Sequence, residues 1–162
     1  MKTPAFLAFY GLLQVEARTI DRIAPTLEAQ TGLPMAWYEV IACLSGAPEE
    51  GRRMNELADE LLVSRGGATR LVARMEEAGL VERITPREDR RATYARLTPA
   101  GFEAEAKASP VLLELVEEHF GQHLDEEDLA ALTRISAKLL RCTCQECTWL
   151  EMATAAGVVT PE

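Results

Sequence analysis

The sequence has few of the features that mark an enzyme or a membrane protein. No run of 18 apolar residues occurs among its 162 residues, so no membrane-spanning helix is expected. Glycine-rich phosphate loops and a Gly-x-Ser-x-Gly turn are absent, and there are only two histidines. Cys–His chemistry is the remaining enzymatic alternative, but both histidines lie beside a predicted helix end. We therefore expect a binding protein and not an enzyme.

The amino terminus lacks the small-residue cleavage site of a secretion signal. Its apolar segment, MKTPAFLAFYGLL, continues as an amphipathic helix through Ile20, Ile23 and Leu27. A cytoplasmic location is therefore expected. The apolar fraction of 48% supports a buried core, and 162 residues fit one domain with an added oligomerisation layer.

Positive charge is scarce, because 17 Lys and Arg face 26 Asp and Glu and the net charge is −9. It is also concentrated in one segment. Residues 52–96 hold ten Arg against eight acidic residues, whereas the rest of the chain holds seven Lys and Arg against eighteen acidic residues. Within residues 64–96 the count is eight against five. A cationic segment in an acidic protein is typical of a nucleic-acid binder that avoids non-specific adhesion.

The apolar pattern predicts six helices and one β-hairpin. Apolar residues at steps of three and four form one helical stripe in the first segment, which Gly32 ends. Pro34 suits the first position of the second helix, and residues 45–53 are predicted to be a loop. The predicted helices span about 5–30, 34–44, 54–61, 65–78, 99–119 and 125–141, and the strands span 81–85 and 92–97.

The most informative run is residues 64–101, SRGGATRLVARMEEAGLVERITPREDRRATYARLTPAG. Ser64 is a natural N-cap for a helix that Gly79 ends, and Thr98 caps the next helix with Pro99 at its first position. The buried side of the first of these helices should carry Ala68, Leu71, Val72 and Met75, and the outward side Arg65, Thr69, Arg70 and Arg74. A helix-turn-helix followed by a basic hairpin is typical of a winged helix that binds DNA.

On these residues the chain resembles the MarR family of transcriptional regulators. The matching segments are the run 64–79, Gly79-Leu80-Val81, the wing motif Asp89-Arg90-Arg91 and Leu97-Thr98-x-x-Gly101, and the resemblance covers roughly residues 5–142. It implies a two-fold dimer built from the terminal helices, with two winged heads. It also implies repression or activation switched by a small molecule, a metal ion or an oxidant. Gly66 and Gly67 depart from the family, whose members usually present larger polar side chains there.

The predicted recognition helix should supply the contacts to base edges. A helix in the major groove offers its N-terminal turns to the bases, and Arg can pair with guanine in bidentate fashion. The residues expected at DNA on this helix are Ser64, Arg65, Gly66, Thr69, Arg70 and, at phosphate, Arg74.

The predicted wing should supply a second group of contacts. Arg91 is expected in the minor groove, where narrow A·T tracts attract arginine. The resemblance implies that Asp89 holds Arg91 in position and that Arg87 and Arg90 contact phosphate. The alternative is that the arginines of helix and wing are solvated surface charges, paired with Glu76, Glu77 and Glu82.

Three of the four cysteines, Cys142, Cys144 and Cys147, form a C-x-C-x2-C pattern near the carboxyl end. Closely spaced thiols in a cytosolic chain favour metal or redox chemistry over structural disulfides, and they suit zinc or copper. Three thiolates do not complete a four-ligand zinc site, so incidental thiols are the alternative. No cofactor is expected to be required, and Zn or Cu at these cysteines stays open.

The remaining thiol and the histidines give weaker indications. His119 and His123 would share one face of a continuous helix, which suits a metal ion, but Gly121 predicts that the helix frays there. Two exposed histidines are the alternative. Cys43 stands at the end of the second helix and is predicted to be a small buried residue. A peroxide-sensing role is the alternative, although the peroxide-sensing branch of the resembled family keeps its cysteine in the first helix.

The resemblance also implies an effector pocket between the dimer layer and the winged head. The candidate lining residues are Leu13, Ala17, Trp37, Ile41 and Leu112. A core role is the alternative for Trp37, because an aromatic residue on an apolar stripe is usually packed inside.

Together these features predict a mainly α (α+β) fold, a winged helix-turn-helix with a dimerisation layer of N- and C-terminal helices. We expect a DNA-binding region over 33–98, a helical dimerisation region over 1–32 and 99–147, and a C-terminal tail over 148–162. The expected function is a sequence-specific regulator, a repressor, that binds double-stranded DNA as a homodimer on an inverted repeat and responds to a small effector. The alternative is a metal- or redox-sensing regulator that uses the C-terminal cysteines.

Overall fold

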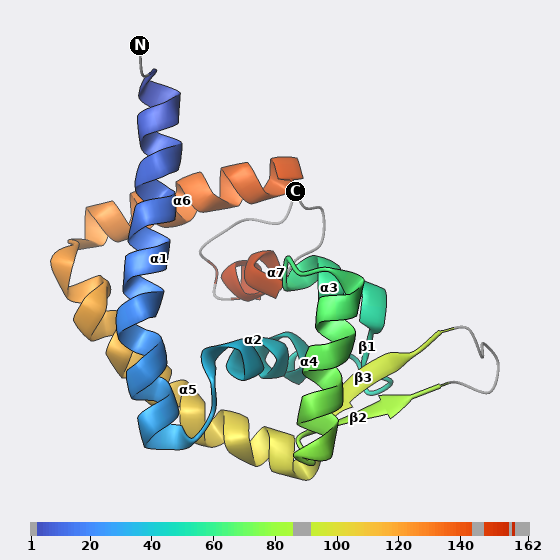
Figure 1. Cartoon of the computed structure of the whole chain (residues 1–162). Helices are drawn as coiled ribbons and strands as arrows, with labels where there is room; N and C mark the ends of the chain where they lie inside the picture. The colour runs from blue at the N-terminus through green and yellow to red at the C-terminus, as the bar shows by residue number, and fades with distance from the viewer. Residues whose placement is uncertain (1–2, 86–91, 144–147, 156, 158–162) are drawn as a thin grey trace.

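The computed structural model describes residues 3–85, 92–143, 148–155 and 157 (Figure 1). Its elements are α1 (Pro4–Thr31), α2 (Met35–Ser45), β1 (Arg52–Arg53), α3 (Met54–Glu60), α4 (Arg65–Glu77), β2 (Val81–Ile84), β3 (Tyr94–Leu97), α5 (Pro99–His119), the 3-10 turn η1 (Gly121–His123), α6 (Glu126–Thr143) and α7 (Thr148–Ala155). The fold is therefore mainly helical with one small antiparallel sheet, as predicted. Within the described helices, none is long and apolar enough to cross a membrane.

The long helix α1 is capped at both ends. The Thr3 hydroxyl accepts a hydrogen bond from the Phe6 amide at 3.2 Å. Gly32 takes a left-handed φ of 73° and donates its amide to the Glu28 carbonyl at 2.8 Å. Ile23 is the first buried residue along α1, so most of this helix lies outside the core.

Helix α2 begins one residue later than predicted. Pro34 has an extended ψ of 146° and precedes the helix, which starts at Met35. This helix crosses the molecule between α5 and α4, and the hydroxyl groups of Tyr38 and Ser109 lie 3.1 Å apart, which links α2 to α5.

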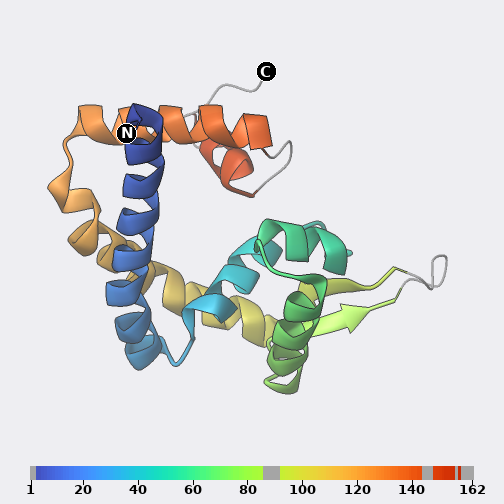
Figure 2. The same ribbon diagram turned by 45° about the horizontal axis from the view of Figure 1, so that its top comes forward.

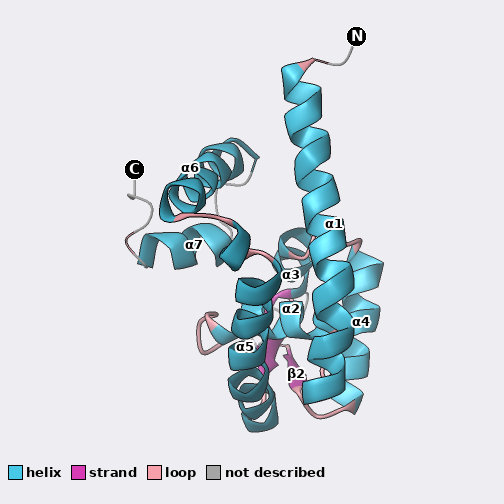
Figure 3. Cartoon of the chain, turned by 90° about the vertical axis from the view of Figure 1, so that its left-hand side faces the viewer, coloured by secondary structure: helices cyan, strands magenta, loops and turns pink. Residues whose placement is uncertain are grey.

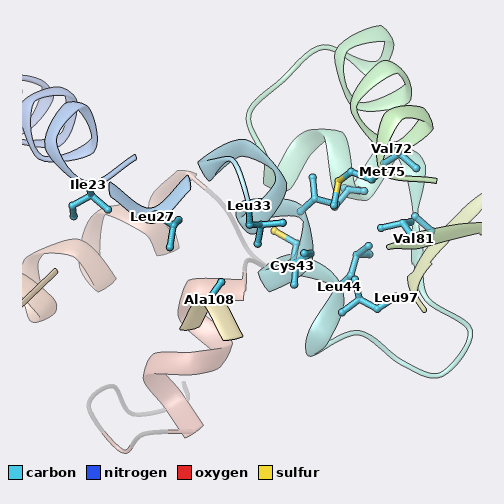
Figure 4. Close-up of a cluster of buried hydrophobic side chains, with 14 of the residues drawn as sticks. Ile23, Leu27, Leu33, Cys43, Leu44, Val72, Met75, Val81, Leu97 and Ala108 are labelled. Atoms are coloured by element: carbon cyan, nitrogen blue, oxygen red, sulfur yellow. The ribbon is translucent and has the colours of Figure 1, made fainter. Parts of the chain in front are cut away.

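The main core lies where α2, α3, α4 and the sheet meet the end of α1 and the middle of α5 (Figure 4). Val72 and Met75 of α4 point toward α2, while Ile23 and Leu27 close the core from α1. Each fully buried aliphatic side chain of this kind contributes about 1.5–3 kcal/mol. The core therefore stabilises the winged head, by which we mean residues 33–98, together with the helix segments that flank it.

The sheet has the strand order β1-β3-β2 and is antiparallel throughout. Val81 pairs with Leu97 and Ile84 with Tyr94, so the hairpin is in the predicted place. Strand β1 corrects the prediction of a loop over 45–53, because Arg53 pairs with Tyr94. Gly51 precedes β1 with a φ of 86°, and a Cβ there would overlap the Ala95 carbonyl.

The start of α5 is attached to the turn between α4 and β2. Thr98 caps α5, since its hydroxyl accepts from the Gly101 amide at 3.1 Å, and the same hydroxyl donates to the Gly79 carbonyl at 2.6 Å. The Thr98 amide donates to the Leu80 carbonyl at 3.1 Å. A Cβ on Gly101 would overlap the Leu80 carbonyl oxygen, which explains why the LTxxG motif ends in glycine.

Figure 2 shows α6, α7 and the N-terminal half of α1 away from the hairpin, while α5 runs from the hairpin toward them. We call α1, α5, α6 and α7 the helical layer. Helix α6 begins after Asp125, whose carboxylate accepts from the Asp128 amide at 2.8 Å. Helix α7 lies within the segment expected to be a tail and packs on α6 through a small cluster of Ala137 and Ala153 with Trp149 and Leu150. Figure 3 shows the N-terminal half of α1 projecting beyond the other elements, with α6 and α7 to one side.

Candidate nucleic-acid interface

Helices α3 and α4 form the helix-turn-helix. The Ser64 hydroxyl accepts from the Gly67 amide at 3.1 Å and so caps α4, as predicted. In the turn, the Val63 amide donates to the Ala58 carbonyl at 3.0 Å. Leu62 adopts a left-handed φ of 54° with 93% of its surface exposed, which is an unfavourable conformation for a residue with a Cβ.

Helix α4 has a buried face and a basic exposed face. Ala68, Val72 and Met75 are buried and Leu71 is half-buried, as the sequence pattern predicts. The side chains on the opposite face are exposed, and they are Arg65, Thr69, Arg70 and Arg74. This face carries three cations, and the exposed carboxylate of Glu77 follows one turn after Arg74 at the C-terminal end of the helix.

The side chain of Arg70 lies next to Gly66, where an added Cβ would meet it in ordinary van der Waals contact. The Nη1 atom of Arg70 lies 3.5 Å from the point where a Cβ on Gly66 would stand. The guanidinium therefore lies over the first turn of α4, which is the part of a recognition helix that meets base edges. Without a side chain at Gly66, the backbone of that turn is also accessible to a close ligand.

Two carboxylates that could have neutralised the basic face are paired elsewhere. Glu76 forms an ion pair with Arg83 at 2.5 Å, and Glu82 forms one with Arg96 at 2.6 Å. The hydrogen bonds from Arg83 lower the pKa of Glu76. The first pair links β2 to the C-terminal end of α4, and the second joins β2 to β3.

The predicted wing-tip residues Arg87, Asp89, Arg90 and Arg91 lie outside the described residues. The strands that lead to them are described, and Figure 1 shows them extending away from the helical layer on the side where α4 is exposed. The hairpin and α4 therefore face the same side of the molecule.

A surface pocket of about 430 Å³ lies between α4 and the hairpin. Its lining residues are Arg53, Met54, Asn55, Arg65, Thr69, Ala92 and Thr93. Arg65 and Thr69 were predicted to contact DNA, but Arg53 and Asn55 were not. The one indication in the sequence is Arg53 itself, because an arginine stands at the N-cap of α3, where Ser, Thr, Asp or Asn is favoured.

The predicted effector residues have two different environments. Ile41 is fully buried, and Trp37 and Leu112 pack against the same core. Leu13 and Ala17 are exposed on the half of α1 that lies outside the core. The first three have the packing of structural residues, and the described pocket lies elsewhere, on the side of α4 and the hairpin.

The thiols and histidines are not gathered around one point in the described part of the chain. Cys142 is exposed near the end of α6, and Cys144 and Cys147 lie outside the described residues. His119 ends α5 and His123 belongs to η1, so one continuous helix does not carry both. No group of three possible metal ligands occurs among the described residues. Cys43 is buried, as predicted.

Comparison with known proteins gives a consistent result. A sequence model of the MarR family matches residues 31–92. The HTH-type transcriptional regulator FarR of Neisseria gonorrhoeae is 28% identical over 117 residues, which cover 72% of this chain and 69% of that protein. AbsC, a MarR family regulator from Streptomyces coelicolor, has a TM-score of 0.77 at 28% identity, covering 90% of this chain and 99% of that one.

A further relative was solved with DNA bound. Sco3205, a MarR family transcriptional regulator from Streptomyces coelicolor in complex with DNA, has a TM-score of 0.74 at 26% identity, covering 82% of this chain and 83% of that one. A helix-turn-helix with a hairpin beside its second helix defines a winged-helix protein. The chain is thus similar to MarR family transcriptional regulators over residues 31–92 and has the winged-helix fold of the solved members.

Proposed function

We propose that the protein is a repressor that binds an inverted repeat in double-stranded DNA as a homodimer and is released by a small effector. The observation that carries the proposal is the exposed basic face of α4, which is capped by Ser64 and lies beside a hairpin. The DNA complex of the similar Sco3205 supports this assignment. The proposed base contacts come from Arg65, Thr69 and Arg70.

The homodimer is supported by the surface of the helical layer. Large apolar side chains are exposed on the first half of α1, and they are Phe6, Leu7, Phe9, Tyr10, Leu12, Leu13 and Val15. Leu129, Ile135 and Leu139 are exposed on α6. Contiguous apolar surface on this scale marks a protein–protein interface, and a second copy of the same helices provides a surface of matching chemistry. Two heads related by a two-fold axis would bind half-sites about 10 base pairs apart.

The DNA assignment can be tested by selecting duplexes from a random library and titrating variants by fluorescence anisotropy. Arg70→Ala should alter the preferred sequence and weaken binding to the selected duplex about 10- to 100-fold, because one bidentate contact is worth about 1–3 kcal/mol. Arg91→Ala should weaken binding to all duplexes. If both variants bind selected and random duplexes like the parent, the assignment is wrong.

The homodimer can be tested by placing a charge on the exposed half of α1. Phe9→Asp should raise the dimer dissociation constant by at least about 100-fold, because each dimer would bury two unpaired carboxylates. Sedimentation velocity at micromolar concentration measures this. Leu62→Asp is the matched control, since it adds the same charge at an exposed position in the head and should leave the dimer intact. A dimeric Phe9→Asp protein would exclude α1 from the interface.

A further inference from the structure

The pocket between α4 and the hairpin is built from three separate elements. Arg53 and Asn55 come from the junction of β1 and α3, Arg65 and Thr69 from the first turns of α4, and Thr93 from the segment that enters β3. The Met54 amide donates to the Thr93 carbonyl at 3.0 Å, so two of the walls are joined by a backbone hydrogen bond. The pocket is therefore fixed before any ligand arrives.

Arg53 is held in a defined orientation. Its Nε donates to the Tyr94 hydroxyl at 2.8 Å, and its guanidinium carbon lies 5.4 Å from the centre of the Tyr94 ring. The side chain is nevertheless half exposed. At the start of a helix a cation opposes the helix dipole, although the Arg53 Nε also lies 4.0 Å from the Glu56 carboxylate of the same helix. A residue that breaks a local rule while neighbours fix its position is typical of a binding site.

The lining of the pocket suits an oxyanion. Two guanidinium groups, those of Arg53 and Arg65, and the amide of Asn55 supply donors, and none of the described lining residues is acidic. The Thr69 hydroxyl is neutral and donates to the Arg65 carbonyl at 2.8 Å. Like charges from two elements face one pocket, and an anion between them would relieve their repulsion.

The position of the pocket identifies the anion, if the protein binds DNA as proposed above. A recognition helix in the major groove and a wing in the neighbouring minor groove lie on opposite sides of one sugar-phosphate strand. That strand must pass between α4 and the hairpin, which is where the pocket lies. We propose that the pocket binds a backbone phosphodiester of this strand, with Arg53 and Asn55 as contact residues in addition to Arg65.

The proposal predicts a change in the salt dependence of binding. Each lost phosphate contact makes the slope of log affinity against log salt shallower by about 0.9, or about 1.8 for a dimer. Binding of full-length Arg53→Gln and parent protein to a random 30-base-pair duplex is compared by anisotropy. Between 50 and 200 mM salt the advantage of the parent should shrink about 12-fold, which follows from that slope. Arg53→Lys keeps the charge and should restore the parental slope.

A charge-matched control separates this contact from the general attraction of cations to DNA. Arg83→Gln removes the same charge from an arginine outside the pocket, whose pair with Glu76 at 2.5 Å is closer than the 4.0 Å pair of Arg53 with Glu56, and it should change the slope by much less than Arg53→Gln. Equal slopes for Arg53→Gln and the parent would overturn the proposal. If the parent itself fails to bind any duplex at low salt, the proposed function fails as well, so the two failures are distinguishable.

An isosteric variant guards against effects on folding. Asn55→Asp places a carboxylate in the pocket but also in the first turn of α3, where negative charge is favourable. The variant should melt no lower than the parent and yet bind random duplex at least about 10-fold more weakly, since it puts a like charge against phosphate. A merely structural role for Asn55 predicts no loss of binding, and that result would count against the pocket.

A free anion could use the same donors, and a DNA-free measurement distinguishes the two sources. Parent and Arg53→Gln are melted in sodium phosphate and in sodium chloride at equal ionic strength. Under the proposal, phosphate gives neither protein a specific stabilisation. Phosphate-specific stabilisation of the parent alone, together with equal salt slopes on DNA, would assign the pocket to a small anion and overturn the proposal.

Discussion

The winged head and the helical layer differ in how they bury their apolar residues. In the head, α2, α3, α4 and the sheet each contribute fully buried side chains to one core, which Ile23, Leu27 and Ala108 complete from the layer. In the layer, the described first half of α1 buries nothing, and among the side chains described in α6 and α7 only Ala137 and Ala153 are buried. One chain is therefore sufficient to bury the core of the head, but it leaves apolar side chains of α1 and α6 exposed in the layer.

Positive charge is concentrated in part of the head, although the whole head of residues 33–98 holds ten Arg and eleven acidic residues. The segment 52–96 holds more Arg than acidic residues, whereas the rest of the chain holds eighteen acidic residues against seven Lys and Arg. Acidic surroundings repel phosphate, so under the proposed function DNA contact is expected at the cationic segment of the head. The head shares its core with α1 and α5, so the unfolding of a dimer would depend on protein concentration for the chain as a whole. Three substitutions, two of them with a matched second variant, test the comparison of head and layer in order of decreasing effect.

The largest effect is expected at Gly101. In Gly101→Ala the new Cβ would overlap the Leu80 carbonyl, which is backbone and cannot move without shifting the hairpin. We expect a loss of about 3 kcal/mol or more in the free energy of unfolding, measured with urea. Because the clash lies within one head, the loss should be the same at low and high protein concentration.

Gly11→Ala in the layer is the control for this substitution. A Cβ on Gly11 meets nothing within 4 Å in the described structure, and alanine favours the helix by up to about 1 kcal/mol. A stabilised Gly11→Ala beside a destabilised Gly101→Ala would sharpen the comparison. Equal effects of the two substitutions would show that the close approach at Leu80 is not what Gly101 provides.

A smaller effect of opposite sign is expected in the helix-turn-helix turn. Leu62 is exposed in a left-handed conformation that costs a residue with a Cβ about 1–2 kcal/mol. Leu62→Gly should therefore stabilise the head by up to about 1 kcal/mol after the entropy of glycine is subtracted. A urea titration measures the gain. If Leu62→Gly lowers stability, the Leu62 side chain makes a contact that its exposure in one chain does not account for.

The smallest effect is expected where head and layer meet, at Glu39 of α2 and Glu16 of α1. Burial raises the pKa of Glu39, and the carboxylate of Glu16 raises it further. Ionising Glu39 therefore costs free energy of unfolding. The cost is absent at low pH, where Glu39 is protonated, and it develops as pH rises toward the folded pKa. Glu39→Gln should therefore be slightly more stable than the parent at pH 7, and the gain should vanish near pH 3.

Glu76→Gln should show the opposite pH dependence. Hydrogen bonds from Arg83 lower the pKa of Glu76, so its contribution is present at neutral pH and is lost as pH falls through the folded pKa. Melting curves of both variants between pH 3 and pH 7 measure the two signs. A Glu39→Gln protein that is less stable than the parent at pH 7 would contradict the inference that burial and the Glu16 carboxylate disfavour ionised Glu39.

Features that depend on near neighbours in the sequence could be predicted. The caps at Ser64 and Thr98 and the left-handed Gly32 need only contacts within a few residues, so local patterns were sufficient. The two faces of α4 follow from helical periodicity alone. The family motifs then supplied the order of the elements.

Features created by distant pairing could not be predicted. Strand β1 has two residues and no periodicity, and it exists because Arg53 pairs with Tyr94. The pocket depends on the same pairing, since Arg53 and Tyr94 are 41 positions apart. Pro34 was assigned to the helix although its ψ is extended, an error of one residue at a boundary. The place of Arg53 in the pocket could therefore be identified only from the folded structure.

The attachment of Thr98 and Gly101 to the α4–β2 turn has a mechanical consequence. Helix α5 runs from that turn into the layer, and its 21 residues measure about 32 Å at 1.5 Å per residue. A rotation of such a lever by about 5° displaces its far end by about 3 Å, which is close to the 3.4 Å rise of one base pair. Under the proposed function, an effector that tilts the layer end of α5 slightly would thus shift α4, at the head end of α5, out of register with the DNA bases.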